Sequence, residues 1–318
     1  MRRARGIAAP VIDPAEPRAS HARIPFLALG ALIVLAVVWG GSIPATKLAL
    51  ADMRPLTLNA LRYLVAAPLC LPILIGRPIP PLRPLLGMLA LGALSALVGQ
   101  VCQVLGVSLT AASIATVIGA TIPILFVLLA ALRLNQPIGP RHVLGLLCAF
   151  LGIGLVATGG PLGFADKVTV LGLTGDALML VSSVAVAVFY VGSTELSAHY
   201  SALTVAAWTT LGAALSMVPV LIGELMVAPF RGSVTSWAVA AYLAALVTVA
   251  GSWVWLKALA HVPARVAASL QYLQPLVGVG LAAALFDDRL GLWFAAGTIM
   301  VFAGIALTSA PAKRKAAA

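Results

Sequence analysis

Charged side chains are scarce in this sequence of 318 residues, making up 9% of it where a soluble domain has about 25%. Acidic residues are the scarcest, with 9 Asp and Glu against 20 Lys and Arg, which gives a net charge of +11. Hydrophobic residues reach 62%. Because so little polar surface cannot cover a core in water, the composition excludes a soluble globular protein and indicates a membrane protein.

Groups that ligate metals or carry catalysis are also few, with 3 cysteines and 4 histidines. The cysteines lie in apolar runs, where packing is their usual role, and the histidines lie in the tail, in loops or at the ends of apolar runs. The sequence has no HExxH zinc motif, and no paired aspartates lie within an apolar run. We therefore expect no enzymatic activity, no metal site and no cofactor.

What the sequence does contain is ten apolar runs. A membrane-spanning helix needs about 20 mostly apolar residues. The runs are continuous and do not alternate with polar residues, which is typical of helices and not of strands. The predicted spans are 26–49, 56–76, 84–106, 111–132, 142–159, 173–193, 203–227, 236–257, 264–286 and 291–310. The polar ends, 1–25 and 311–318, are expected to be basic tails, the first of them disordered.

The second half of the chain repeats the first. Residues 99–158 align with residues 251–310 without a gap, with 14 of 60 positions identical, and Pro123 falls on Pro275. The two copies span residues 26–159 and 173–310. Because each copy holds five helices, an odd number, the second enters the membrane from the opposite side. The predicted fold is therefore an all-α integral membrane protein with ten transmembrane helices in two inverted five-helix repeats.

The distribution of Lys and Arg predicts the orientation. The segments on the side of the N-terminus hold 14 of these residues and the segments on the other side hold 4. Positive residues concentrate in the cytoplasm, so both termini are predicted to be cytoplasmic, in a bacterial inner membrane. The basic excess then faces anionic lipid, and the expected partner is the bilayer and not a nucleic acid.

Short motifs follow one another in a fixed order along residues 26–310. They are W-G-G-S from Trp39 followed by Lys47, Pro55 with Arg62, Pro123, Gly175 with Asp176, and Pro275. In this order and spacing the chain resembles the EamA-type branch of the drug/metabolite transporter superfamily. The resemblance implies a secondary transporter that exports amino acids or similar small amphipathic metabolites by alternating access. The alternative is a carrier of organic anions such as sugar phosphates or nucleotide sugars.

Two cations, Lys47 and Arg62, lie inside apolar runs. A charge within the membrane is expensive and is a functional candidate by default. Each can extend to the interface or bond backbone carbonyls, or it can meet a carboxylate or phosphate of a substrate. We assign Arg62 to a substrate site together with Asn59, which lies three residues earlier on the same helix face. Lys47 is expected near the outer mouth.

Polar amides form a second group of candidates. A buried amide without partners is costly, so such residues either join helices or line a wet cavity. The four glutamines Gln100, Gln103, Gln271 and Gln274 lie on the two helices that precede or carry the repeated proline unit, and we assign them to the cavity.

Aromatic residues and prolines complete the candidates. Four aromatic side chains are candidate cavity walls, although packing against lipid or core is an equal alternative: Trp39, Tyr190, Trp208 and Trp253. Pro123 and Pro275 each remove a helix hydrogen bond, so they are candidate hinges or passive kinks.

No carboxylate falls at the middle of a predicted span, because Asp176, Glu195 and Glu224 lie near span ends. This disfavours a proton-coupled exporter of cations. Protons or another ion remain candidate coupling partners for a small-molecule substrate, and a monomer and a homodimer are both open.

Overall fold

A computed structural model describes residues 26–133, 140–158, 169–229, 231–259, 273–286 and 290–309, and these residues form helices and no strand. The first half holds α1 (Phe26–Gly40), α2 (Ser42–Ala49), α3 (Pro55–Leu74), α4 (Leu82–Leu94), α5 (Val101–Leu109), α6 (Ala112–Gly119), α7 (Ile122–Arg133) and α8 (Pro140–Thr158). The second half holds α9 (Val170–Ser197), α10 (Ala202–Val227), α11 (Val234–Ala241), α12 (Gly251–Leu259), α14 (Leu273–Phe286) and α15 (Leu292–Ser309).

Two π-helical turns join shorter helices into longer ones. The turn η1 (Ser95–Gln100) links α4 to α5, and the turn η2 (Tyr242–Ala250) links α11 to α12. π-Helical turns are rare inside α-helices and occur often at functional sites. Each half of the chain therefore contains one long helix with a locally widened backbone.

Six helical segments of the described chain are long and apolar enough to cross a membrane, judged by length and composition. They are Phe26–Ala49, Pro55–Leu74, Leu82–Leu109, Val170–Ser197, Ala202–Val227 and Val234–Trp255. Continuous apolar sequence explains both their length and their exposed leucines and valines, which suit lipid as a solvent.

Prolines explain where two predicted spans are interrupted. Gly41 separates α1 from α2, and Pro44 in the first turn of α2 has no N–H for the carbonyl of Gly40. Likewise, Pro123 is the second residue of α7, just after the turn that separates α6 from α7. In both places the break precedes a proline in the first helical turn, a position that tolerates it.

Small residues allow the closest contacts between the two halves. A Cβ atom on Gly152 of α8 would lie 2.5 Å from the carbonyl oxygen of Gly297 of α15, and the reverse contact is also 2.5 Å. A Cβ atom added to Gly92 of α4 or to Gly212 of α10 would lie closer still to the backbone carbonyl oxygen of Thr209 or of Leu89. Such glycines let backbones touch in membrane proteins, where lipid leaves little hydrophobic drive between helices.

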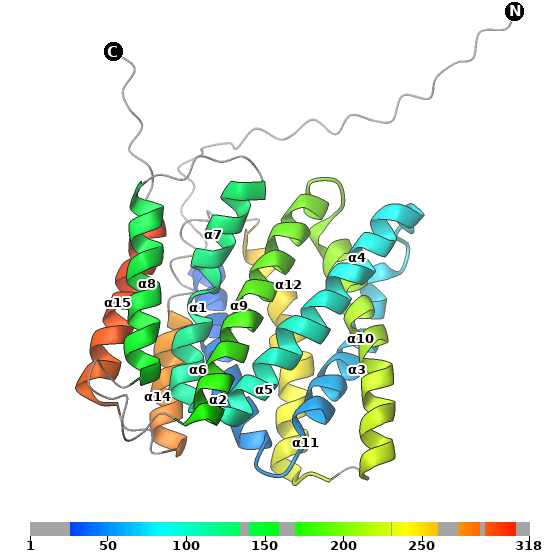
Figure 1. The fold of residues 1–318 in the computed structure, drawn as a ribbon. Coiled ribbons are helices and arrows are strands. Elements are labelled where there is room, and N and C mark those ends of the chain that lie inside the picture. Colours follow the sequence, from blue (N-terminus) through cyan, green and yellow to red (C-terminus); the bar gives the residue numbers. More distant parts are fainter. Residues whose placement is uncertain are drawn as a thin grey trace, which may run out of the picture.

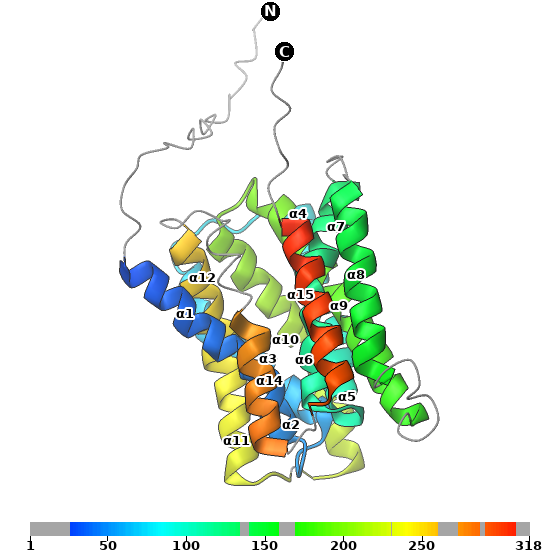
Figure 2. The same cartoon turned by 90° about the vertical axis from the view of Figure 1, so that its left-hand side faces the viewer.

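The helices form one bundle in which segments from both halves alternate (Figure 1). α8 packs along α15 at one edge, and α3 and α4 pack along α10 at the other. Figure 2 shows that α1 begins and α15 ends on the same side of the bundle. We call the opposite side, with the α2–α3 and α10–α11 loops, the Arg54 end.

Candidate functional site

Arg62 lies on α3, one of the six membrane-length helices. Arg54 is extended, as expected before a proline, and Pro55 begins the helix with its preset backbone angle. Arg62 follows seven positions later, which places it about 10 Å along the helix from its start at the Arg54 end. The charge therefore lies well inside the length of the helix, on a half-buried residue.

The guanidinium of Arg62 bonds to one residue from each π-helical turn. Its Nη1 donates to Gln100 Oε1 at 2.7 Å, and its Nε donates to Thr248 Oγ1 at 2.9 Å. Thr248 in turn donates to the carbonyl of Leu243, five residues earlier, at 2.8 Å. The first half of the chain supplies Gln100 and the second half supplies Thr248, so Arg62 joins the two halves.

Four predicted residues meet at a small pocket beside this group. The lining residues are Thr46, Leu58, Asn59, Arg62, Gln100, Gln103, Val104 and Leu243. Asn59 is buried, with 4% of its surface exposed, and its amide nitrogen lies 3.5 Å from Ala96 O. Gln103 makes no hydrogen bond to a described residue. The structure thus brings Asn59, Arg62, Gln100 and Gln103 to one place.

The described residues around Arg62 include polar groups and no acid within ion-pair distance. Among the described residues, no carboxylate lies within 4.0 Å of its guanidinium, since the ion pairs found there belong to Arg54 and Arg133. The guanidinium carbon lies 5.6 Å from the ring centre of Tyr63. An uncompensated cation beside a pocket suits an anionic or strongly accepting ligand.

The described part of the chain contains no group of three His, Cys, Asp or Glu side chains that could hold a metal ion. The pocket offers amides, one hydroxyl and one guanidinium. These groups can bind and orient a polar solute, and they include no nucleophile paired with a base.

The EamA-like transporter family matches residues 26–158 and, separately, residues 173–310. The chain belongs to this family. An uncharacterized transporter of Archaeoglobus fulgidus is 26% identical over 88% of this chain and 96% of its own length. The uncharacterized transporter YetK of Bacillus subtilis is 24% identical over 88% of this chain and 87% of its own.

A solved crystal structure shares the fold, with a TM-score of 0.58 and 17% sequence identity over 88% of this chain and 94% of the other. Together with the six apolar helices, the family match makes this chain a multi-pass membrane protein of a transporter family. The predicted resemblance to the EamA-type branch is confirmed.

Lys47 of this EamA-like protein lies outside the Arg62 pocket lining. Its Nζ donates to the carbonyls of Val107 and Thr110 at 2.7 and 2.8 Å and lies 3.3 Å from Ser108 O. These carbonyls belong to the C-terminal end of α5 and the residue after it, where helix carbonyls lack partners and cations are favourable. Lys47 therefore stabilises the end of α5.

The predicted aromatic residues of the transporter are spread over several surfaces. Trp39 donates from Nε1 to Val247 O at 2.9 Å and packs on Trp255, with ring centres 6.0 Å apart, so it supports η2 from behind the pocket. Tyr190 is 43% exposed and contacts Phe126 edge-on at 6.2 Å. Trp253 is 46% exposed, and Trp208 is half-buried on α10.

The remaining predicted residues belong to the repeated proline unit. Gln274 is half-buried in α14, and its backbone carbonyl would lie 2.6 Å from a Cβ on Gly40, so α1 and α14 touch there. Pro275 is buried in the first turn of α14, and Pro123 lies in the first turn of α7. Gln271 lies outside the described residues.

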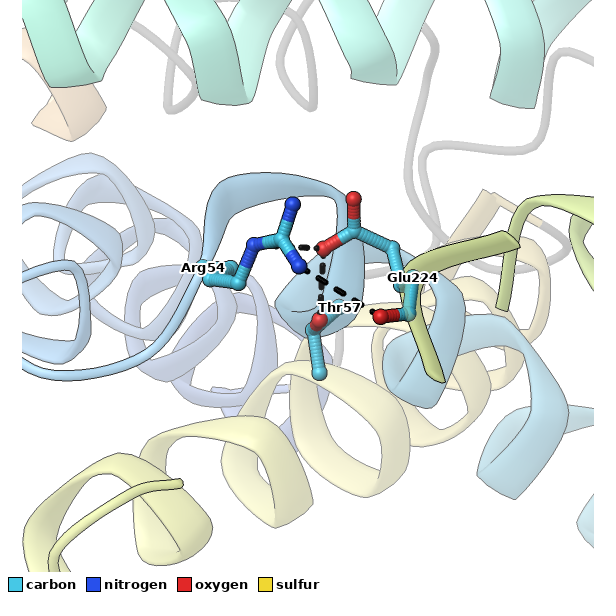
Figure 3. Close-up of polar contacts among 3 residues, drawn as sticks. All are labelled: Arg54, Thr57 and Glu224. Carbon is cyan, nitrogen blue, oxygen red and sulfur yellow. Dashed lines mark hydrogen bonds and ion pairs between the residues drawn. The ribbon is translucent and has the colours of Figure 1, made fainter. Parts of the chain in front are cut away.

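The acidic residues near span ends each have a partner at the edge of the bundle. Glu224 accepts from Thr57 Oγ1 at 2.9 Å and pairs with Arg54 Nε at 3.1 Å, a contact that joins α10 to the start of α3 (Figure 3). Glu195 pairs with Arg133 at 2.9 Å. The hydroxyl of Thr110 donates to Asp176 Oδ1 at 2.6 Å.

Sequence reasoning missed Thr248, the second partner of Arg62. Threonine is common in apolar helices, and Thr248 lies just before the repeated segment 251–310. No pattern in the sequence singled it out.

Proposed function

We propose that this EamA-like protein is a secondary transporter that exports amino acids or similar small amphipathic metabolites by alternating access across a bacterial inner membrane. The observation that carries the proposal is the position of Arg62. It lies in a membrane-length helix, beside a pocket, and is held by one residue from each family-matched segment. A polar site at the contact between two repeats is where such carriers bind their solute.

The proposed architecture has ten transmembrane helices in two inverted five-helix repeats, 26–159 and 173–310, flanked by cytoplasmic tails. Two observations support it. The family match falls in two separate segments, and α1 begins on the side of the bundle where α15 ends (Figure 2). The excess of Lys and Arg on that side supports a cytoplasmic location for both termini.

A second candidate function is the carriage of organic anions such as sugar phosphates or nucleotide sugars. The lack of an acid near Arg62 among the described residues favours it. Amino acids and similar small metabolites stay the first candidate, as the resemblance to the EamA-type branch implies.

Counterflow in proteoliposomes tests the proposal. Vesicles that contain the purified protein are loaded with unlabelled amino acids, organic acids or nucleotides, and the labelled compound is added outside. Saturable uptake that depends on the internal compound supports a carrier and names its substrate. Flux that does not saturate and is not stimulated from the other side contradicts alternating access.

The same vesicles test the coupling and the assembly. An imposed pH or sodium gradient that drives accumulation identifies protons or another ion as the coupling partner. Light scattering of the purified protein distinguishes a monomer from a homodimer.

A further inference from the structure

We propose that the Arg62 site recognises its substrate through a carboxylate, and that an ammonium group on the substrate contributes little to binding. This inference rests on the proposed function and specifies which group of the substrate the site recognises. It predicts that a 2-oxo acid binds about as well as the amino acid with the same side chain. It also predicts that the corresponding amine, which lacks the carboxylate, binds far more weakly.

The first argument is charge balance. The two arginines with ion pairs in the described structure, Arg54 and Arg133, each have a glutamate at 3.1 Å or less. The partners of Arg62 are an amide and a hydroxyl, which are neutral. A cation inside the membrane is costly without a counter-charge. An anionic ligand therefore stabilises the Arg62 guanidinium more than a neutral ligand can.

The second argument is the number of donors that remain. Thr248 uses Nε and Gln100 uses Nη1, and no hydrogen bond joins Nη2 to a described residue. Nη2 carries two N–H donors. Because the other two nitrogens are held, the guanidinium cannot turn freely, and its remaining edge keeps one direction. Each of these charged N–H donors can bond an oxygen of an anion such as a carboxylate.

The third argument is what the pocket lacks. Its eight lining residues include no Asp or Glu, so an ammonium group finds no counter-charge there. Asn59, Gln103 and Thr46 are neutral and can bond a hydroxyl, a carbonyl or an amine alike. The pocket therefore favours the anionic end of an amino acid over its cationic end.

Matched probes test this inference directly. Each of a set of side chains is presented as the amino acid, the 2-oxo acid and the amine, and inorganic phosphate is included as a separate anion. Binding is measured as thermal stabilisation of the purified protein, and transport as competition in counterflow. We expect the 2-oxo acid to compete within about threefold of the amino acid and the amine to be weaker by about 30-fold or more.

The outcomes separate this inference from the proposed function. If carboxylates bind but nothing exchanges, the carboxylate site stands and the carrier is wrong. If exchange occurs and the amine competes as well as the amino acid, the carrier stands and the carboxylate site is wrong. Stabilisation and exchange by phosphate alone also overturn the carboxylate assignment.

Gln100→Glu provides the sharpest variant because it is nearly isosteric. It places a carboxylate where the amide oxygen now lies, 2.7 Å from Arg62 Nη1, and so supplies the missing counter-charge from within. We expect carboxylate binding to fall by about tenfold or more, with no loss of amine binding. Gln100→Met is the matched neutral control, expected to weaken carboxylate binding by only about threefold. Wild-type carboxylate binding in Gln100→Glu would refute the inference.

A second variant covers the case in which Gln100→Glu does not fold. Thr248→Val removes the partner of Nε and keeps a β-branched shape, so the guanidinium gains freedom to turn. Carboxylate binding should weaken by about threefold or more while amine binding stays the same. Equal weakening of both probe classes would show that Thr248 supports the fold and not the carboxylate.

Discussion

Two arginines eight positions apart show opposite ways of holding a charge. Arg54 precedes α3 and meets Glu224, whose oxygen lies 3.1 Å from Arg54 Nε and 2.9 Å from Thr57 Oγ1 (Figure 3). Arg62 lies within α3 and has only neutral partners among the described residues, Gln100 and Thr248. The residue type is the same, and the charge balance differs between the residue before α3 and the residue within it.

The difference distinguishes a structural contact from a binding site. The Arg54 side chain is 44% exposed, so water and Glu224 both stabilise its charge, and the pair joins α3 to α10 at the edge of the bundle. Arg62 lies beside a pocket and lacks an acid there. A charge that is already neutralised has little left to offer a ligand, whereas an uncompensated one favours an anion.

The largest expected effect is a loss of transport in Arg62→Ala, which is compared with the effect of Arg54→Ala on stability. Arg62→Ala should lower counterflow by about 100-fold or more while expression in the membrane is unchanged, because the ligand loses its counter-charge. Arg54→Ala should lower the free energy of unfolding by about 1–2 kcal/mol, since Glu224 loses a partly exposed partner. It should leave substrate preference unchanged. Counterflow and thermal unfolding in detergent measure the two effects.

The two variants serve as controls for each other. Normal counterflow in Arg62→Ala would remove Arg62 from the site. Loss of carboxylate binding in Arg54→Ala, with the fold intact, would mean that both arginines serve the ligand and that charge balance does not separate them. A double-mutant cycle with Glu224→Gln measures how much of the Arg54 effect belongs to the pair.

A smaller effect is expected at Lys47, which is a third cation. In the hydrogen bonds described above, its Nζ donates to oxygen atoms. Those oxygens are carbonyls at the end of α5, so Lys47 resembles a helix cap. Lys47→Met keeps the apolar stem and should lower stability by about 1 kcal/mol and counterflow by about threefold, with the same order of substrates. If Lys47→Met instead abolishes carboxylate binding as Arg62→Ala is expected to, Lys47 belongs to the substrate site.

Much of the fold could be predicted from the sequence, because lipid as a solvent demands long apolar helices with few charges. The described helices lie within or close to the predicted spans, and α5 and α9 extend the furthest beyond them. Asn59, Arg62, Gln100 and Gln103 could be found because a polar side chain in an apolar run is exceptional. These four line the same pocket.

The contacts that the sequence could not predict are made by backbone groups or by common residue types, which no pattern singles out. The partners of Lys47 are backbone carbonyls, which no residue pattern identifies. Thr248 reaches Arg62 from a π-helical turn, and no residue type reliably marks such a turn. The pairing of Arg54 with Glu224 joins positions 170 residues apart and could be read only from the packing of α3 against α10.

The smallest expected effect concerns Asp52, whose exposed carboxylate extends the comparison of Arg54 and Arg62 to an acidic side chain. Asp52 lies in the α2–α3 loop, and no basic side chain among the described residues lies within 4.0 Å of it. Its oxygens accept from the hydroxyl of Ser236 and from the backbone N–H of Ser233, the latter at 2.6 Å. Hydrogen bonds from Ser236 and Ser233 lower the pKa of Asp52. Water and these donors together replace a counter-ion.

Because the pKa of Asp52 is lowered by folding, its contribution to stability is present above the unfolded pKa of about 3.9 and is lost as the pH falls through the folded pKa. The melting temperature of Asp52→Asn in detergent should therefore lie slightly below that of the wild type near pH 6, and the gap should close as the pH falls below the unfolded pKa and through the lower folded pKa. A gap that stays constant with pH would show that shape and not charge holds the loop. The melting temperature could also fall as far in Asp52→Asn as in Arg54→Ala. Exposure to water would then not weaken a charge contact at the Arg54 end, and the contrast between Arg54 and Arg62 would need another cause.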